Sequence, residues 1–372
     1  MTFLESFISG VSLFQMTLPQ WAMIALALVL VYLAIVKKYE PLLLLPIAFG
    51  MMIANIPVAG LSAYDEGGLL WFLYQGIALV IYPPLIFLCL GAMTDFGPLI
   101  ASPKTAIVGL GGQVGIFAAF GFALLFGFDA MESASIGIIG SSDGPTAILT
   151  TVMLAPDLLP VIAIAAYSYM ALVPIIQPPI MRALTTKEER VIVMPEPKRV
   201  TTLQKIIFPI AVTLVVLLFV PAAGALISMM MLGNLIKESG VTERYVRTLQ
   251  NDALNILTLV IGVSIGATAT AERMLQIQTL QIIGLGLLAF CFGTAGGVLI
   301  AKLLCKLTGG KVNPLIGNAG VSAMPMAARV SQKLGQEYNP QNHLLMHAMG
   351  AIVASTIGSA IVAGIFIAMY SS

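Results

Sequence analysis

Long apolar runs, separated by short polar or glycine- and proline-containing stretches, make up nearly the whole chain. A helix needs about 20 apolar residues to cross the hydrocarbon core of a bilayer. On this basis the pattern predicts about eleven membrane segments and an all-α polytopic membrane protein. We expect the segments at residues 21–36, 42–56, 69–96, 105–127, 133–154, 158–184, 206–236, 253–270, 279–304, 313–330 and 344–370.

Several of these segments contain residues that break helices. Tyr82-Pro83-Pro84 divides segment 69–96, because paired prolines remove helix hydrogen bonds. The sequence SSDGPT interrupts segment 133–154, NPLIGNAGVSAMP interrupts segment 313–330, and Pro221 bends segment 206–236. Discontinuous helices of this kind are typical of transporters, where they form substrate and ion sites near the middle of the membrane.

The composition excludes several classes of protein. The 372 residues are 59% hydrophobic and 9% charged, which leaves too few charges for the surface of a soluble enzyme. Lys+Arg 18 against Asp+Glu 17 leaves no basic surface, so no nucleic-acid partner is expected. The 35 glycines and 21 prolines indicate close helix packing and broken helices. No Walker A, GxGxxG or CxxC motif is present, so ATP, NAD and zinc are not expected.

The polar stretch 185–205 divides the chain into two similar halves. Leu90-Gly91-Ala92 in the first half parallels Ile265-Gly266-Ala267 in the second, and Gly140 and Gly317 follow them at similar distances along the chain. Five segments per half would invert one copy relative to the other across the membrane. We therefore predict an N-terminal interfacial stretch and first membrane helix (1–40), a first inverted repeat (41–184), a polar cytoplasmic loop (185–205) and a second inverted repeat (206–372). The alternative is coincidence among helices rich in glycine and alanine.

Basic residues predict the orientation. Positive side chains favour the cytoplasmic side, and six of them surround the central loop: Arg182, Lys187, Arg190, Lys198, Arg199 and Lys205. Lys37-Lys38 also favours the cytoplasmic side. Five predicted crossings lie between Lys37-Lys38 and the central loop, so the two cannot be on the same side of the membrane. We give more weight to the larger cluster. The first 18 residues lack a basic region typical of a cleavable signal peptide and indicate a short amphipathic stretch in the interface.

Asp143 is the strongest candidate for a functional residue. A carboxylate in the middle of a membrane costs about 2.5–3.5 kcal/mol on insertion scales and is tolerated mainly for function. It lies where Gly144 and Pro145 break the helix, next to the hydroxyls of Ser142 and Thr146. A carboxylate, hydroxyls and freed carbonyls are the oxygen ligands that suit a hard cation such as Na⁺. The structural alternative is that Asp143 only caps a half-helix.

The second broken segment offers further polar groups. Asn313, Ser322 and the carbonyls around Gly317 can contribute oxygens, and small residues there would let two half-helices meet at their tips. Arg329 either marks the membrane boundary or binds a carboxylate, for which guanidinium geometry is suited. Tyr169 lies in an apolar run, where a tyrosine is usually a packed aromatic with one satisfied hydroxyl.

Three features of the sequence are specific enough to compare with known families: GIIGSSDGPTAI, Tyr169 on the following helix, and NPLIGNAGVSAMPMAARVSQKLG. In these features the chain resembles the β subunit of the biotin-dependent, sodium-translocating decarboxylases. The resemblance covers nearly the whole chain. It implies a fold similar to elevator-type sodium carriers, with two inverted repeats and discontinuous helices. It also implies a multi-pass protein of the bacterial inner membrane that acts on oxaloacetate, malonate or an acyl-CoA substrate through its partners.

The resemblance implies a translocase that decarboxylates carboxybiotin, exports Na⁺ and consumes a proton. Biotin would be attached to a partner, so the implied partners are a carboxyltransferase, a biotin carrier and a small membrane subunit, and several β chains would associate. The resemblance places the Na⁺ ligands at Asp143, Ser322, Asn313 and Gly317, to which the local sequence adds Ser142 and Thr146. Arg329 and Asn313 would contact carboxybiotin, and Tyr169 would supply the proton, because a bound Na⁺ would stabilise its phenolate.

The chain departs from the family pattern at one place, and two other functions are alternatives. Family members often have Pro-Asn after His347-Ala348-Met349-Gly350, where this chain has Ala351-Ile352, so Ser355 and Thr356 would have to replace that asparagine. A secondary Na⁺/carboxylate symporter fits the broken helices and Asp143 equally well. A purely structural membrane anchor would not need Asp143 in a broken helix.

Overall fold

The computed structural model describes residues 10–38, 40–196, 199–324 and 326–370, and its regular elements within these ranges are all helices. In the first half these are η1 (Ser12–Gln15), α2 (Leu18–Ile35), α3 (Pro41–Ala54), α4 (Leu69–Ala78), α5 (Tyr82–Met93), α6 (Gly97–Ala101), α7 (Lys104–Gly111), α8 (Val114–Leu125), α9 (Ala130–Gly137), η2 (Ile138–Gly140), α10 (Gly144–Leu154), η3 (Pro156–Leu158) and α11 (Leu159–Leu184). From the central loop onward they are α12 (Lys187–Arg190), α13 (Thr202–Phe219), η4 (Pro221–Ala223), α14 (Gly224–Ser239), α15 (Glu243–Thr248), η5 (Leu249–Ala253), α16 (Leu254–Thr268), α17 (Ala271–Met274), α18 (Ile277–Leu307), η6 (Pro314–Gly320), α19 (Met326–Tyr338) and α20 (Leu345–Tyr370).

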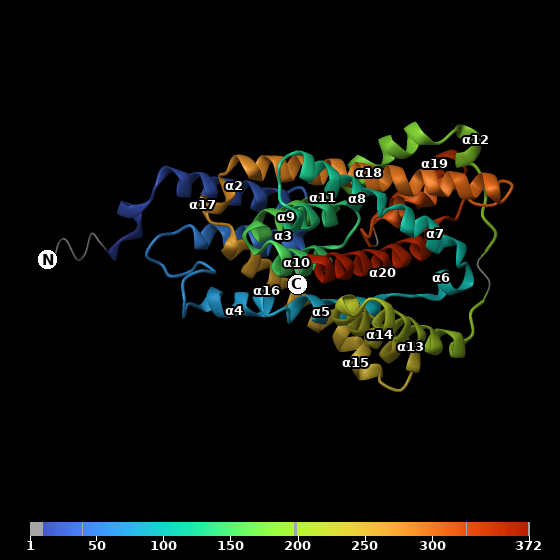
Figure 1. Cartoon of the computed structure of the whole chain (residues 1–372), viewed down its shortest axis with the longest axis horizontal. Coiled ribbons are helices and arrows are strands. Elements are labelled where there is room, and N and C mark those ends of the chain that lie inside the picture. The colour runs from blue at the N-terminus through green and yellow to red at the C-terminus, as the bar shows by residue number, and fades with distance from the viewer. Residues whose placement is uncertain (1–9, 39, 197–198, 325, 371–372) are drawn as a thin grey trace, which may run out of the picture.

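The helices confirm an all-α polytopic membrane protein. Among the described residues, six helices are long and apolar enough to cross a membrane, or up to eight if each sharply bent pair forms one span. The number is smaller than the eleven segments predicted, because α3 and α10 are shorter apolar helices. α20 is 72% buried along its most apolar window, whereas α13 is 11% buried, so α20 lies in the interior and α13 on the periphery (Figure 1).

The predicted breaks fall where the sequence places them. α4 and α5 are bent by 68° relative to each other, and Pro83 and Pro84 lie in the first turn of α5. Pro221 begins the short helix η4 between α13 and α14. Segment 313–330, however, is not one spanning helix: it forms the buried 3-10 helix η6 and the start of α19, which continues to Tyr338. A 3-10 turn of small residues cannot extend far enough to cross a bilayer.

Two glycine-mediated helix crossings relate the halves. Gly91 of α5 lies against the backbone carbonyl of Met230 in α14, and Gly266 of α16 lies against the backbone of α3. A side chain at either glycine would collide with the opposing backbone. Each crossing thus joins one helix from each half, and the partners exchange roles between the two crossings. Glycines of the opposing helices also take part, Gly233 in the first crossing and Gly50 in the second. The inverted repeat stays a prediction.

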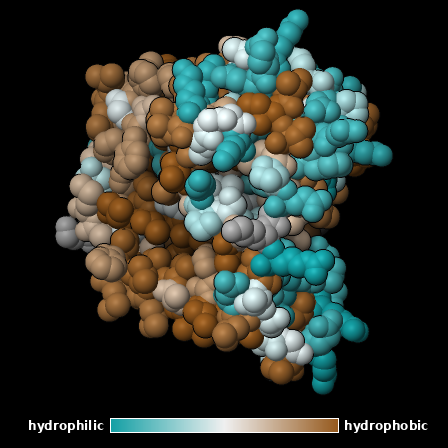
Figure 2. Space-filling model, turned by 90° about the vertical axis from the view of Figure 1, so that its right-hand side faces the viewer, coloured by the Kyte–Doolittle hydropathy of each residue, from teal (hydrophilic) through white to brown (hydrophobic). Residues whose placement is uncertain are grey.

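The central loop and the helix ends around it form the polar end of the molecule, on the right in Figure 1. Arg190 anchors this loop although it is 8% exposed. Its guanidinium donates to Thr185 Oγ1 at 2.9 Å and to the Tyr338 hydroxyl at 2.7 Å, and its carbonyl accepts from Asn313 and Asn342. Viewed from this end, hydrophilic side chains gather on one side and hydrophobic ones on the other (Figure 2). Lys198 of the predicted basic cluster and residues 1–9 of the predicted interfacial stretch lie outside the described residues.

Candidate functional site

Asp143 lies in the interruption between η2 and α10. Its Oδ1 accepts a hydrogen bond from the backbone N–H of Thr146 at 2.9 Å, and Pro145 occupies the first turn, so Asp143 does cap α10. The cap uses one carboxylate oxygen. The other, Oδ2, is buried with no protein partner among the described residues, and the hydroxyls of Ser142 and Thr146 are in the same condition.

Three buried oxygens without a partner in one short segment make it a candidate ligand site. A buried polar atom without a partner costs about 1–3 kcal/mol, and here three such atoms come from five consecutive residues. Oxygen-only donors with one carboxylate fit a hard monovalent or divalent cation. A group of three or more His, Cys, Asp or Glu side chains suited to a transition metal is not found in the part of the chain that the structure describes.

The second broken segment and α20 close this site from the other side. Ser141 Oγ donates to the Gly320 carbonyl at 2.8 Å, and the N–H of Ser322 donates to the Ser141 carbonyl at 3.0 Å. Ser322 Oγ donates to Ser355 Oγ at 3.0 Å, and Ser355 Oγ also bonds the Gly320 carbonyl. The two broken segments therefore meet at their tips, and α20 is fixed to both of them by hydroxyl groups.

A cavity of about 170 Å³, which we call the Asp143 cavity, opens beside this junction. Oxygen-bearing side chains line it from both halves of the chain. They include Glu40, Thr94, Asp143, Thr258, Ser322 and Thr356. With two carboxylates and no basic residue among its lining groups, the cavity favours a cation.

Asn313 and Gly317 do not line this cavity. The Asn313 amide donates to the carbonyls of Arg190 at 3.0 Å and Ile192 at 2.8 Å, and its oxygen accepts from the N–H of Leu315. The Gly317 carbonyl lies against Gly297 of α18, where a side chain would collide with it. The structure thus brings Asp143 and Ser322 to one cavity. Ser142 and Thr146 lie beside Asp143 in the chain but do not line that cavity, and Asn313 and Gly317 position the second broken segment.

Two tyrosines on α11 have different surroundings. The Tyr169 hydroxyl donates to the Ile283 carbonyl, and its ring lies against Gly286 of α18. Tyr167, two residues earlier, lines the Asp143 cavity, and its ring and hydroxyl lie directly over Gly144. Sequence analysis missed Tyr167, because two tyrosines in one apolar run give no indication of which one faces the cavity.

Arg329 lies in the first turns of α19 and is exposed. It lines neither the Asp143 cavity nor the larger cavity described below. Its guanidinium has no protein partner within the described residues, so it is free to bind a group that approaches from outside.

A buried amide network, also missed by sequence analysis, supports the second broken segment. The Asn318 amide donates to Gln177 Oε1 at 2.7 Å and to the Ala327 carbonyl at 2.9 Å. Gln177 of α11 donates back to the Asn318 carbonyl at 3.1 Å. The indications in the sequence were Asn318 among the small residues of the second broken segment and Gln177 among the prolines of α11.

Comparison with known proteins shows the family of the chain. Residues 19–370 match the family model described as the Na⁺-transporting oxaloacetate decarboxylase beta subunit. The chain belongs to this β-subunit family. The chain is 52% identical to the methylmalonyl-CoA decarboxylase subunit beta of Veillonella parvula, over 99% of this chain and 98% of that one. It is 53% identical to the glutaconyl-CoA decarboxylase subunit beta of Acidaminococcus fermentans (93% and 92%) and 46% identical to the oxaloacetate decarboxylase beta chain of Klebsiella pneumoniae (98% and 98%).

The family assignment confirms the resemblance found in the sequence. This β subunit is a membrane subunit of a sodium-pumping decarboxylase, part of a multi-subunit complex, and the symporter alternative is not favoured.

Proposed function

We propose that this β subunit decarboxylates carboxybiotin and uses the free energy to export Na⁺, which binds in the Asp143 cavity. A carboxyltransferase would load the biotin, a carrier subunit would deliver it to the cytoplasmic face, and a small membrane subunit and further β chains would complete the complex. The observation that carries this proposal is the buried Asp143 Oδ2, which has no hydrogen-bond partner, on a residue that lines one cavity together with Ser322. The hydroxyls of Ser142 and Thr146, close to Asp143 in the chain, have none either.

Each broken segment has its own part in this proposal. Asp143 would bind Na⁺ from the first, with the unpaired hydroxyls of Ser142 and Thr146 beside it in the chain. Ser322, with Thr356 of α20, would bind it from the second. Asn313 and Gly317 hold the second segment in place rather than binding the ion. Movement of α20 would change both sets of ligands together, because Ser355 bonds the Gly320 carbonyl and Ser322 at the junction.

The reaction needs a proton. When the carbon–nitrogen bond of carboxybiotin breaks, the carboxyl leaves as CO₂ and the bond's electron pair stays on the ureido nitrogen, which then takes a proton. Tyr167 lines the Asp143 cavity, so a Na⁺ there would lie close to its hydroxyl and stabilise a phenolate. Tyr169 remains the residue that the family resemblance favours for the same step. Arg329, exposed and without a partner, is proposed to bind the carboxylate on its approach.

The side of the membrane is part of the proposal as well. The basic residues at the polar end, among them Arg182, Lys187 and Arg190, favour the cytoplasm of a bacterial inner membrane for this end. A soluble carrier would then reach the protein from the side on which the central loop lies.

The experiment is CO₂ release from carboxybiotin by the purified complex, together with ²²Na⁺ uptake into inverted vesicles. We expect release to require Na⁺ and to stop when K⁺ replaces it. Asp143→Asn should assemble normally, since removing a buried charge does not hinder insertion, but lose both activities. Asp157→Asn is the matched control, because Asp157 pairs with Arg273 at an exposed site away from the Asp143 cavity. Near-normal Na⁺ transport by Asp143→Asn would contradict the proposal.

A further inference from the structure

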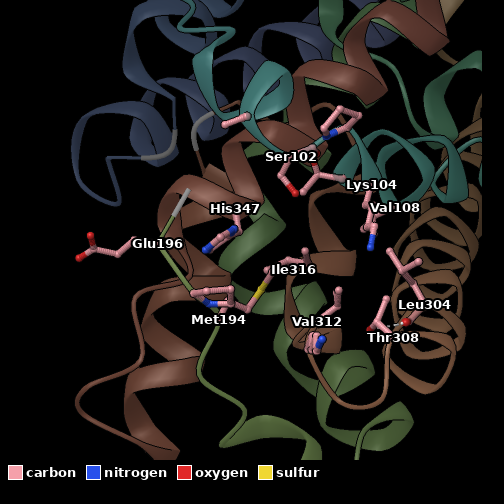
Figure 3. Close-up of a pocket in the computed structure, with 15 residues that line it drawn as sticks. Ser102, Lys104, Val108, Met194, Glu196, Leu304, Thr308, Val312, Ile316 and His347 are labelled. Carbon is pink, nitrogen blue, oxygen red and sulfur yellow. Dashed lines mark hydrogen bonds between the residues drawn. The ribbon is translucent and has the colours of Figure 1, made fainter. Parts of the chain in front are cut away.

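A larger cavity of about 430 Å³, which we call the Lys104 cavity, lies at the polar end of the molecule. The start of α7, the end of α18, η6, α20 and residues 194–196 of the central loop enclose it (Figure 3). Its volume is in the range of small-molecule sites, about 300–1,000 Å³. The Asp143 cavity is less than half as large, so the two are suited to different ligands.

The charges of the Lys104 cavity favour an anion. Lys104 and Lys311 line it, and neither forms an ion pair within the described residues, although seven other ion pairs occur there. Glu196 is its one acidic lining residue, and in Figure 3 the carboxylate extends away from His347 and the other labelled side chains. The sign of the charge is therefore opposite to that in the Asp143 cavity.

His347 gives an independent indication of a ligand. The side chain is 5% exposed and lines the cavity, and its Nδ1 has no hydrogen-bond partner. The ring lies next to the backbone of Pro195, whose carbonyl can accept from Nε2; Nδ1 would then be the acceptor of a neutral imidazole. A buried acceptor of this kind requires a donor, and an N–H group on the ligand would supply it.

The remaining walls are apolar. Val108, Leu304, Val312 and Ile316 line the cavity beside the two lysines. The complementary ligand is a compact apolar ring that carries a carboxylate and one free N–H.

We propose that the Lys104 cavity captures the N-carboxylated ureido ring of biotin, an inference that rests on the proposed function. The carboxylate binds Lys104 and Lys311, the uncarboxylated ureido N–H donates to Nδ1 of His347, and the sulfur-containing ring packs on the apolar walls. While no Na⁺ is bound, Asp143 and Glu40 repel the carboxylate from the Asp143 cavity, so the ring is captured in the Lys104 cavity.

Helix α20 connects the two cavities. His347 lines the Lys104 cavity and Thr356 lines the Asp143 cavity. Nine residues of α-helix separate them by about 14 Å along the axis. Capture of the ring and binding of Na⁺ therefore occur at separate places on one rigid element, and α20 is the element through which each can affect the other.

The cavity acts in capture rather than in bond breaking. Ammonium groups stabilise a bound carboxylate but not neutral CO₂, so their contacts do not favour the transition state. Losing them should raise KM without lowering kcat. For the complex acting on free carboxybiotin, we expect Lys104→Gln and Lys311→Gln each to raise KM about tenfold. The Na⁺ concentration for half-maximal rate should not change.

Lys306→Gln is the matched control, because Lys306 is exposed near the same end of α18 and does not line the cavity. An unchanged KM in the Lys104→Gln/Lys311→Gln double variant, with normal wild-type activity, would overturn the cavity assignment alone. Absence of CO₂ release by the wild-type complex would contradict the proposed function itself.

Occupancy can be measured without turnover. A thiol introduced by Ser102→Cys, in a chain with Cys291→Ala, would lie in the Lys104 cavity and react with a maleimide. We expect carboxybiotin to slow this reaction at least fivefold and biotin methyl ester to slow it less, with no effect of Na⁺ alone. Gln278→Cys, at an exposed position outside the cavity, should not be protected. Protection by inorganic phosphate or phosphatidylglycerol vesicles but not by carboxybiotin would overturn the proposal.

Discussion

At the scale of single residues, Asp143 has two roles that the sequence presents as alternatives. It caps α10 through Oδ1, and its Oδ2 remains unsatisfied inside the protein. Capping orients the carboxylate, because the bond from the Thr146 N–H fixes its position at the helix terminus. Capping thus gives the Asp143 carboxylate the fixed orientation that binding of a cation would require.

The two tyrosines of α11 can be separated by paired variants. Only Tyr167 lines the Asp143 cavity, so we expect Tyr167→Phe to lower Na⁺-dependent CO₂ release at least tenfold and to change its dependence on alkaline pH. Tyr169→Phe should mainly cost stability, about 1 kcal/mol, through loss of the bond to the Ile283 carbonyl. Initial rates of CO₂ release from pH 6 to 9 test both. A larger loss of rate in Tyr169→Phe would assign the proton to Tyr169, as the family resemblance favours.

Arg329 is tested by keeping its charge. A guanidinium binds a carboxylate through two parallel hydrogen bonds, which an ammonium cannot reproduce. We expect Arg329→Lys to lower kcat/KM for carboxybiotin about tenfold, with Lys333→Gln, one turn further along α19, as the control. Full activity of Arg329→Lys at low carboxybiotin concentration would show that Arg329 does not bind the carboxylate and only marks the membrane boundary.

At the scale of elements, glycines determine how closely the helices approach. Gly91 lies against the Met230 carbonyl, and a Cβ there would overlap the backbone of α14. Gly121 of α8 has no neighbouring atom in the space of its missing side chain. The same substitution should therefore have opposite effects at these two positions.

We expect Gly91→Ala to destabilise the protein by about 1–3 kcal/mol, because α5 and α14 must move apart. Gly121→Ala should be neutral or stabilise by up to about 1 kcal/mol, since alanine is the better helix former. Thermal unfolding of the two variants in the same detergent measures the difference. Equal shifts in Tm would show that the α5–α14 crossing does not limit stability.

At the scale of the whole molecule, Arg190 connects the central loop to both halves. Its guanidinium bonds Thr185 and Tyr338 without a carboxylate partner, and Asn313 and Asn342 bond its carbonyl. We expect Arg190→Lys to destabilise by about 2–3 kcal/mol, because an ammonium has fewer donors and cannot match the planar arrangement. Lys187→Gln on the same short helix is exposed and should have little effect. Thermal unfolding would detect the difference, and an unchanged Tm for Arg190→Lys would contradict this role.

The whole molecule also separates two kinds of charge. Carboxylates gather in the Asp143 cavity, and unpaired lysines gather in the Lys104 cavity about 14 Å away along α20. A cation and an anion can thus be bound at once without neutralising each other, and the proposed pump requires such an arrangement.

The sequence by itself determined the helical membrane fold, the positions of the breaks and the place of Asp143 in one of them. Apolar length, proline and glycine act locally, and a carboxylate within an apolar run is unfavourable wherever the helix lies. The tertiary structure alone decided which polar groups meet. Tyr167 rather than Tyr169 lines the cavity that contains Asp143. The Asn313 side chain forms its hydrogen bonds with the central loop. One cavity is lined by Lys104, Lys311 and His347. These contacts join residues far apart in the chain, and the direction in which a buried side chain points depends on the packing of helices, which no local pattern specifies.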